Sequence, residues 1–101
     1  MNAQTTKITG TSLPTPGAYI RECRARSGRS LAKCASMVAV HAHDRARAES
    51  DLAALEADVP GDYLRLVRLL RDRGAFAFSL DTFLLLAAGT ADATLDPWAE
   101  I

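Results

Sequence analysis

The sequence is poor in aromatic residues and in cysteine, and it has no long apolar run. Phe, Trp and Tyr make up 6% of its 101 residues, whereas Ala and Leu are abundant. This composition favours helices and argues against a β-sandwich. Two cysteines, Cys23 and Cys34, are too few for a disulfide framework, so we expect reduced thiols in an intracellular protein.

The chain also lacks the apolar segments that direct proteins to membranes. Its longest apolar run, Phe83 to Ala88, is far shorter than the roughly 20 residues of a membrane-spanning helix. The first residues are polar and contain no apolar core of a signal peptide. We therefore expect a cytoplasmic protein with no membrane partner.

The net charge is zero, but the charges are unevenly distributed. Residues 17–47 carry seven Arg and Lys against two acidic residues, whereas residues 48–101 carry four Arg against ten acidic residues. One interpretation is a dipolar molecule that turns a basic face to a polyanion. The alternative is a chance distribution in a short chain.

Apolar spacing and capping residues predict an all-α domain of five short helices. Thr15, Ser30, Asp44 and Ser79 are the expected caps, and the third helix is expected to bury Ala48, Leu52, Leu55 and Val59. Phe76, Phe78 and Phe83 are expected in the core. The predicted helices run from Pro16 to before Gly28, from Leu31 to about Ala39, from Asp44 to about Asp58, from Asp62 to about Arg73 and from Leu80 to Ala88.

The domain organisation follows from these elements. Residues 1–15 are polar and predict a flexible N-terminal arm. Residues 16–89 form the predicted helical domain. Residues 90–101 are interpreted as a polar C-terminal tail that carries Trp98.

The basic half of the chain resembles the phage-repressor and Cro-like helix-turn-helix family, often called XRE. The features that carry the resemblance are an apolar-Arg-x-apolar-Arg first helix, a Gly, a Ser cap and a small residue in the second helix: Ile20, Arg21, Cys23, Arg24, Gly28, Ser30 and Ala35. Leu55 and Glu56 resemble the end of the recognition helix. Arg29 stands where the family usually has an apolar residue, and sixteen positions separate Val40 from Glu56, about two helical turns more than is typical.

The resemblance implies a compact five-helix domain of the lambda-repressor-like type that binds double-stranded DNA as a sequence-specific transcription regulator. The second helix of the pair would enter the major groove, with Arg45 and Arg47 at its start and Ser50 one turn further along. Ser30 and Lys33 would contact phosphate, and His41 or His43 could do so from the turn. The additional residues lengthen either this helix or the turn before it.

The resemblance also implies a structural ion pair between Arg24 and Glu56, which would tie the first helix to the end of the third. A homodimer would suit a two-fold DNA reader. The last helix has more apolar residues than one face can bury, so it is either central to the core or exposes Leu85 and its neighbours to a second subunit. An alternative function is a helical protein-interaction module that does not bind DNA.

Other chemistries find little support in the sequence. Cys23, Cys34, His41 and His43 lack the short spacings of zinc sites, so we expect no metal. The sequence contains no Gly-rich phosphate loop and no nucleophile elbow, so we expect neither an enzyme nor a cofactor, and we infer no small-molecule ligand.

Overall fold

Side-chain caps set the first residue of three helices in the computed structural model, which describes residues 13–92 and 94–99. Helix α2 (Pro16–Arg26) begins where the Thr15 hydroxyl accepts the N–H of Ala18 at 3.1 Å. Helices α3 (Leu31–Val38) and α6 (Leu80–Ala88) begin at Ser30 and Ser79, whose hydroxyls accept backbone N–H groups in the same way. These capping predictions are confirmed, because each hydroxyl satisfies an N–H that has no partner within the helix.

The third predicted helix differs from expectation at both ends. A 3-10 turn, η2 (Ala42–Asp44), continues directly into α4 (Arg45–Glu56). The prediction that Asp44 caps this helix is wrong, because Asp44 is itself helical (φ −87°, ψ −10°) and makes no capping hydrogen bond. The prediction that Val59 is buried is also wrong. The helix ends at Glu56, Asp58 reverses the chain at φ 58°, and Val59 is 48% exposed.

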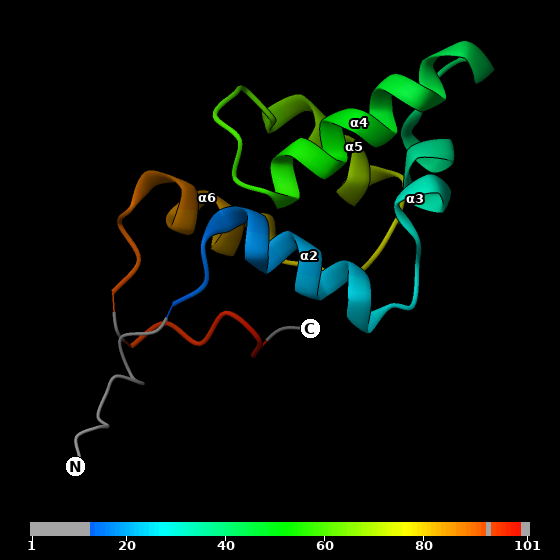
Figure 1. Cartoon of the computed structure of the whole chain (residues 1–101). Helices are drawn as coiled ribbons and strands as arrows, with labels where there is room; N and C mark the ends of the chain where they lie inside the picture. Colours follow the sequence, from blue (N-terminus) through cyan, green and yellow to red (C-terminus); the bar gives the residue numbers. More distant parts are fainter. Residues whose placement is uncertain (1–12, 93, 100–101) are drawn as a thin grey trace.

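Helix α5 (Leu64–Asp72) begins two residues after Asp62, where the sequence predicted its start. The carboxylate of Asp62 accepts the N–H of Leu64 at 3.2 Å, so this Asp forms a local turn before the helix. All the described regular structure is helical: five α-helices and the 3-10 turn, without a strand in residues 13–92 and 94–99. The all-α fold class is confirmed at this level (Figure 1).

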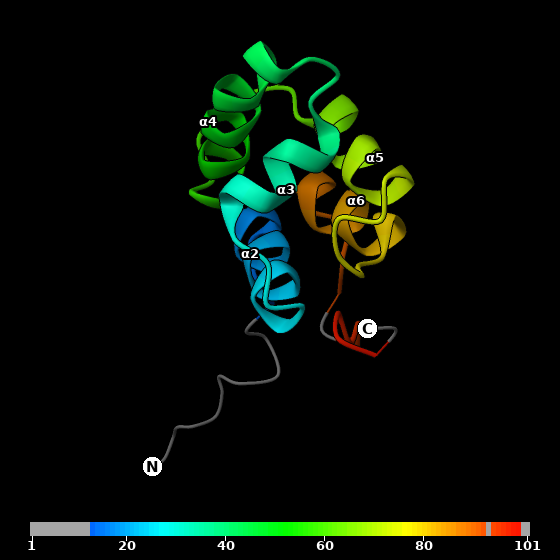
Figure 2. The ribbon, with the colours of Figure 1, turned by 90° about the vertical axis from the view of Figure 1, so that its right-hand side faces the viewer.

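The core lies where the helices cross. Helix α3 packs mainly on α4 and also on α5, while α2 contacts both α4 and α6 (Figures 1 and 2). The residues with no exposed surface are those predicted from the apolar stripes, together with the linker residue Ala75: Tyr19, Ile20, Cys34, Ala35, Leu52, Val67, Leu70 and Ala75. Phe76 and Phe83 are buried, and Phe78 packs against the core, as expected.

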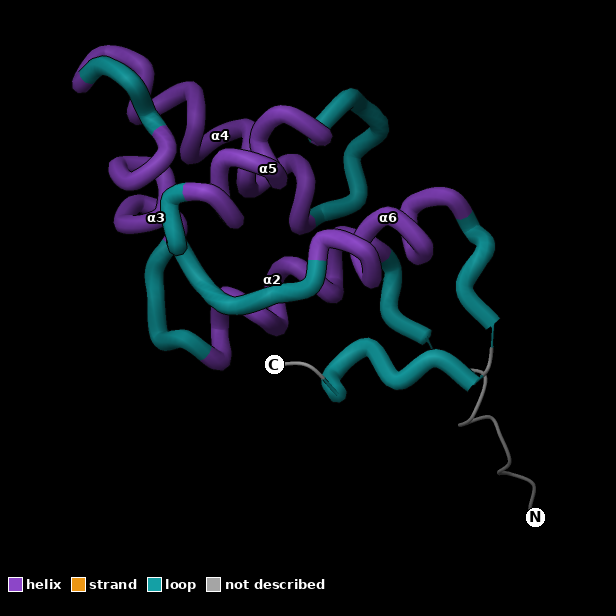
Figure 3. The backbone as a smooth tube through the Cα atoms, turned by 180° about the vertical axis from the view of Figure 1, so that it is seen from behind, coloured by secondary structure: helices purple, strands orange, loops and turns teal. Residues whose placement is uncertain are grey.

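The residues assigned to the C-terminal tail pack back onto the domain. Pro97 is buried, and the ring of Trp98 lies 5.3 Å from that of Tyr19. The Arg26 guanidinium lies over the Trp98 ring at 4.6 Å, which favours a cation–π interaction. Figure 3 shows this segment running beside α2. Most of the predicted N-terminal arm, residues 1–12, lies outside the described residues.

The turn after α4 also caps α2. The Asp58 carboxylate accepts a hydrogen bond from the Thr15 hydroxyl, with an O–O distance of 2.6 Å, and another from the backbone N–H of Gly17, with an N–O distance of 2.8 Å. A carboxylate is favourable there because the helix N-terminus carries partial positive charge. Gly17 permits this close crossing, since a Cβ there would lie against the carbonyl oxygen of Leu55 and 2.9 Å from that of Glu56.

No helix in the described ranges is both long enough and apolar enough to cross a membrane.

Candidate nucleic-acid interface

Arg45 and Arg47 lie near the start of a long helical segment. We call this segment the rod and define it as η2 together with α4, residues 42–56. At about 1.5 Å per residue the rod is about 22 Å long. Its first end extends past α3 at the upper right of Figure 1. The extra residues between Val40 and Glu56 therefore lengthen the helix more than the turn.

The second half of the rod is fixed in the core. Leu52 and Leu55 are buried among the other helices. Arg24 of α2 donates from Nε and Nη2 to the two carboxylate oxygens of Glu56, at 2.6 and 2.8 Å. The expected ion pair is thus present, and it is bidentate. Because its base is anchored, the rod can hold the exposed end at a defined angle to the domain.

Arg45 and Arg47 lie in the first turn of α4, and both side chains are exposed. The guanidinium of Arg47 lies 4.0 Å from the carboxylate of Asp51, one turn along the rod, and 87% of its side chain remains exposed. An exposed pair at that distance is weak and is screened by salt. Arg45 takes part in no ion pair within the described residues, so both cations are free to meet an anion.

Ser50 and the two histidines extend the same exposed surface. Ser50 lies three residues after Arg47, which places them on neighbouring positions of one helix face. His41, just before the rod, and His43, in its first turn, are exposed, and their rings are stacked 5.3 Å apart. The His43 ring also lies 3.5 Å from the Asp44 carboxylate. The predicted residues of the rod end are therefore near one another in the chain and open to solvent.

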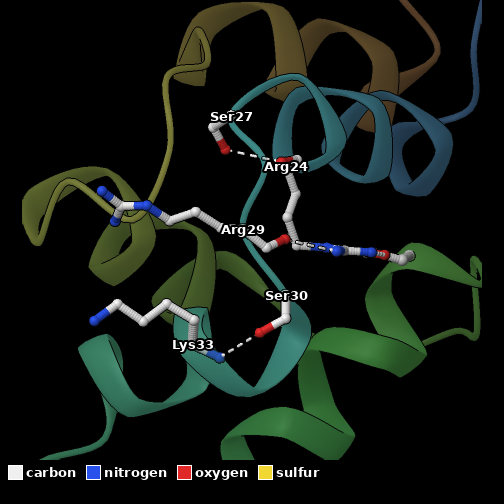
Figure 4. Close-up of polar contacts among 6 residues, drawn as sticks. Arg24, Ser27, Arg29, Ser30 and Lys33 are labelled. Atoms are coloured by element: carbon white, nitrogen blue, oxygen red, sulfur yellow. Dashed lines mark hydrogen bonds and ion pairs between the residues drawn. The ribbon is translucent and has the colours of Figure 1, made fainter.

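Ser30 and Lys33 lie at the other predicted contact point, the start of α3. The Ser30 hydroxyl accepts the N–H of Lys33 at 3.0 Å, and both side chains are exposed. Figure 4 shows the Lys33 and Arg29 side chains pointing in the same direction from this helix start. Ser30 thus caps α3, while the ammonium group of Lys33 is available to a ligand.

Arg29 and Arg73 were not among the binding residues predicted from the sequence. Arg29 lies in the loop before α3, and Arg73 follows α5, forty-four positions later in the chain. Both contact Met37 of α3. The one available signal was an Arg at position 29, where an apolar residue was expected. Nothing in the local sequence placed Arg73 beside it.

The two buried thiols, Cys23 and Cys34, resist ionisation. Burial raises the pKa of Cys23 to about 11, and it also raises that of Cys34, so both remain protonated near neutral pH. In the described part of the chain, no group of three or more His, Cys, Asp or Glu side chains could hold a metal ion. The hydrogen bond from Arg24 to Glu56 raises the pKa of Arg24, which stays charged.

Comparisons with protein-family models, with curated proteins and with solved structures found no match to this chain.

Proposed function

We propose that this protein binds double-stranded DNA as a sequence-specific transcription regulator, with the first end of the η2–α4 rod in the major groove. The observation that carries the proposal is the exposed pair Arg45 and Arg47 at the projecting end of a helix whose base is anchored in the core. A major groove about 12 Å wide admits an α-helix, and Arg can donate two hydrogen bonds to guanine.

The arrangement of α3 and α4 supports a helix-turn-helix of the repressor type. The two helices pack closely and are separated by a short loop and the 3-10 turn. In such a motif the first helix contacts the phosphate backbone while the second reads bases. Ser30 and Lys33 would then contact phosphate, and Ser50 would extend base reading along the rod.

The test begins with a fluorescent duplex of random sequence, whose binding is measured as salt concentration is varied. Selection from a random duplex library then identifies the preferred sequence. We expect Arg45→Ala with Arg47→Ala to abolish the preference, because each bidentate pair with a base contributes about 1–3 kcal/mol of discrimination. The matched control, Arg21→Ala with Arg68→Ala, removes the same charge from exposed positions on α2 and α5 and should keep the preference.

Two outcomes would overturn the proposal. If the Arg45 and Arg47 variant prefers the selected sequence as strongly as the control does, the rod end is not the reading surface. If the unmodified protein binds no duplex even at low salt, the DNA-binding function is wrong.

A homodimer belongs to the same proposal, because two subunits would present two rods to a two-fold site. The candidate contact is the exposed apolar surface around Leu84 and Leu85 of α6, each 40% exposed, with Leu64 and Val59 nearby in an apolar hollow. Leu84→Glu should convert a dimer to a monomer in sedimentation equilibrium. A monomeric parent protein at micromolar concentration would contradict the dimer.

The same apolar hollow favours a second candidate function, a protein-interaction module without DNA binding. Two acidic residues, Asp58 and Asp62, are among those that line it. An apolar site with acidic neighbours suits a partner protein better than a phosphate backbone. Absence of duplex binding, together with intact folding, would favour this function.

A further inference from the structure

Two arginines converge on one residue of α3. Arg29 Nη1 lies 2.8 Å from the Met37 sulfur, and Arg73 Nη1 donates to the Met37 carbonyl at 3.1 Å. Met37 lies four residues after Lys33, so the two share a face of α3. Three cations from three separate segments are thus gathered on the outer side of this helix: Arg29, Lys33 and Arg73.

The charges of this cluster are not neutralised by the protein. None of the three takes part in an ion pair in the part of the chain that the structure describes. Glu56 is bound by Arg24, and Asp72 by Arg71 at 3.0 Å. The contacts of Arg29 and Arg73 with a sulfur and with carbonyl oxygens orient the guanidinium groups but leave their positive charge for an external anion.

A shallow hollow lies beside the cluster. Arg29 of the cluster lines it together with Ser27, Arg71 and the largely apolar residues 74–78, whereas Lys33 and Arg73 lie outside it. Figure 2 looks onto α3 and onto the loop that follows α5, while the start of the rod lies at the top of the same view. A duplex bound at both places would have to extend from the rod end along α3.

We infer that Arg29 and Arg73, with Lys33, form a phosphate-binding surface. This surface binds the DNA backbone beside the base pairs that the rod contacts. This inference rests on the proposed DNA-binding function and adds two residues to it. The planar guanidinium groups can each bind a phosphate through two hydrogen bonds. Backbone contacts fix the orientation of a protein on the duplex but carry no sequence information.

The experiment measures duplex affinity against salt concentration for three proteins. Each phosphate contact contributes about 0.9 to the slope of log affinity against log salt. Arg29→Gln with Arg73→Gln should therefore reduce the slope by about 1.8, and it should weaken binding to selected and random duplexes equally. The control, Arg21→Gln with Arg68→Gln, removes two exposed charges elsewhere and should leave the slope within about 0.5 of the unmodified protein.

The possible outcomes separate the phosphate-binding surface from DNA binding by the rod. Equal slopes for the Arg29 and Arg73 variant and the control overturn this inference while leaving DNA binding by the rod intact. No duplex binding by the unmodified protein overturns both. If the double variant fails to fold, Lys33→Gln decides, because the Lys33 side chain makes no hydrogen bond or ion pair in the described structure. It should reduce the slope by about 0.9, and an unchanged slope would contradict the surface.

Discussion

Arg24 and Glu56 join the end of α2 to the end of α4 through two parallel hydrogen bonds of 2.6 and 2.8 Å. A third donor of Arg24, Nη1, binds the carbonyl of Arg29 at 2.9 Å, so one guanidinium also positions the loop before α3. Glu56 is nearly buried, with 6% of its side chain exposed. The pair therefore connects the end of α4, the candidate DNA-reading helix, to α2 and to the loop before α3.

Glu56→Gln should lower the free energy of unfolding by about 3 kcal/mol, because the Arg24 charge would be left without its counterion in a largely buried site. Glu22→Gln is the control, since it breaks an exposed pair with Arg26 and should cost less than about 1 kcal/mol. Urea unfolding followed by circular dichroism measures both. Equal effects of the two substitutions would show that the buried pair contributes little.

For Gly17→Ala, helix propensity and packing predict opposite changes in the free energy of unfolding, and we expect packing to dominate. Helix propensity alone would make this variant more stable by about 1 kcal/mol. A Cβ at position 17 would instead overlap the backbone at the end of α4, so we expect a loss of about 2 kcal/mol. Gly28→Ala is the comparison, because Gly28 has a positive φ of 70° and no neighbour within 4 Å of an added Cβ.

Thermal and urea unfolding of the two glycine variants should rank Gly17→Ala as the less stable. A Gly17→Ala protein more stable than the parent would mean that α2 and α4 do not approach so closely.

Trp98→Ala should destabilise the domain by about 2 kcal/mol, because the half-buried indole covers Tyr19 and lies under Arg26. Arg26→Gln, which removes the cation–π contact and the exposed pair with Glu22 but keeps the indole in place, should cost less than about 1 kcal/mol. Urea unfolding by circular dichroism compares them. An unchanged midpoint for Trp98→Ala would show that the C-terminal segment does not contribute to the folded domain.

Stability should decline at alkaline pH. Burial raises the pKa of Cys23 from 9.0 to about 11, so the folded state keeps a thiol that the unfolded chain ionises. The stabilisation is full below about pH 9 and falls by up to about 1.4 kcal/mol per pH unit as pH rises towards 11. Tyr19, with a pKa raised by burial to about 12, extends the decline at higher pH.

Urea unfolding over this pH range checks the decline, and Cys23→Ala should remove part of the pH dependence. If the slope is the same in the parent and the variant, Cys23 is not its source.

Asp51→Asn should strengthen duplex binding at low salt by about threefold. Asp51 is the weak partner of Arg47 and adds negative charge to the rod, so its removal reduces repulsion from phosphate. Asp81→Asn, at an exposed position on α6, is the control for the removal of a negative charge elsewhere. Fluorescence anisotropy measures both, and weaker binding of the Asp51 variant would contradict DNA binding by the rod.

The sequence predicted the helices whose ends have local causes and missed those that depend on distant contacts. Ser30 and Ser79 cap helices through N–H groups three residues away, so a local pattern was enough. Asp58 was placed in a helix, but it bends out at a positive φ and caps α2, more than forty residues away. No periodicity within the third helix could reveal that interaction.

The candidate site divides in the same way. Arg45, Arg47 and Lys33 could be proposed from their positions relative to predicted helix starts. The convergence of Arg29 and Arg73 on Met37 could not, because they lie on segments far apart in the chain.

The sequence by itself determined the number and kind of helices, the buried stripes apart from Val59, and the uneven charge, because these follow from composition, spacing and capping within a few residues. Only the tertiary structure decided that the long third helix projects from an anchored base, that Trp98 returns to α2 and that three cations meet on α3. Those features depend on how the helices cross, and crossing is set by the packing of side chains that are distant in sequence.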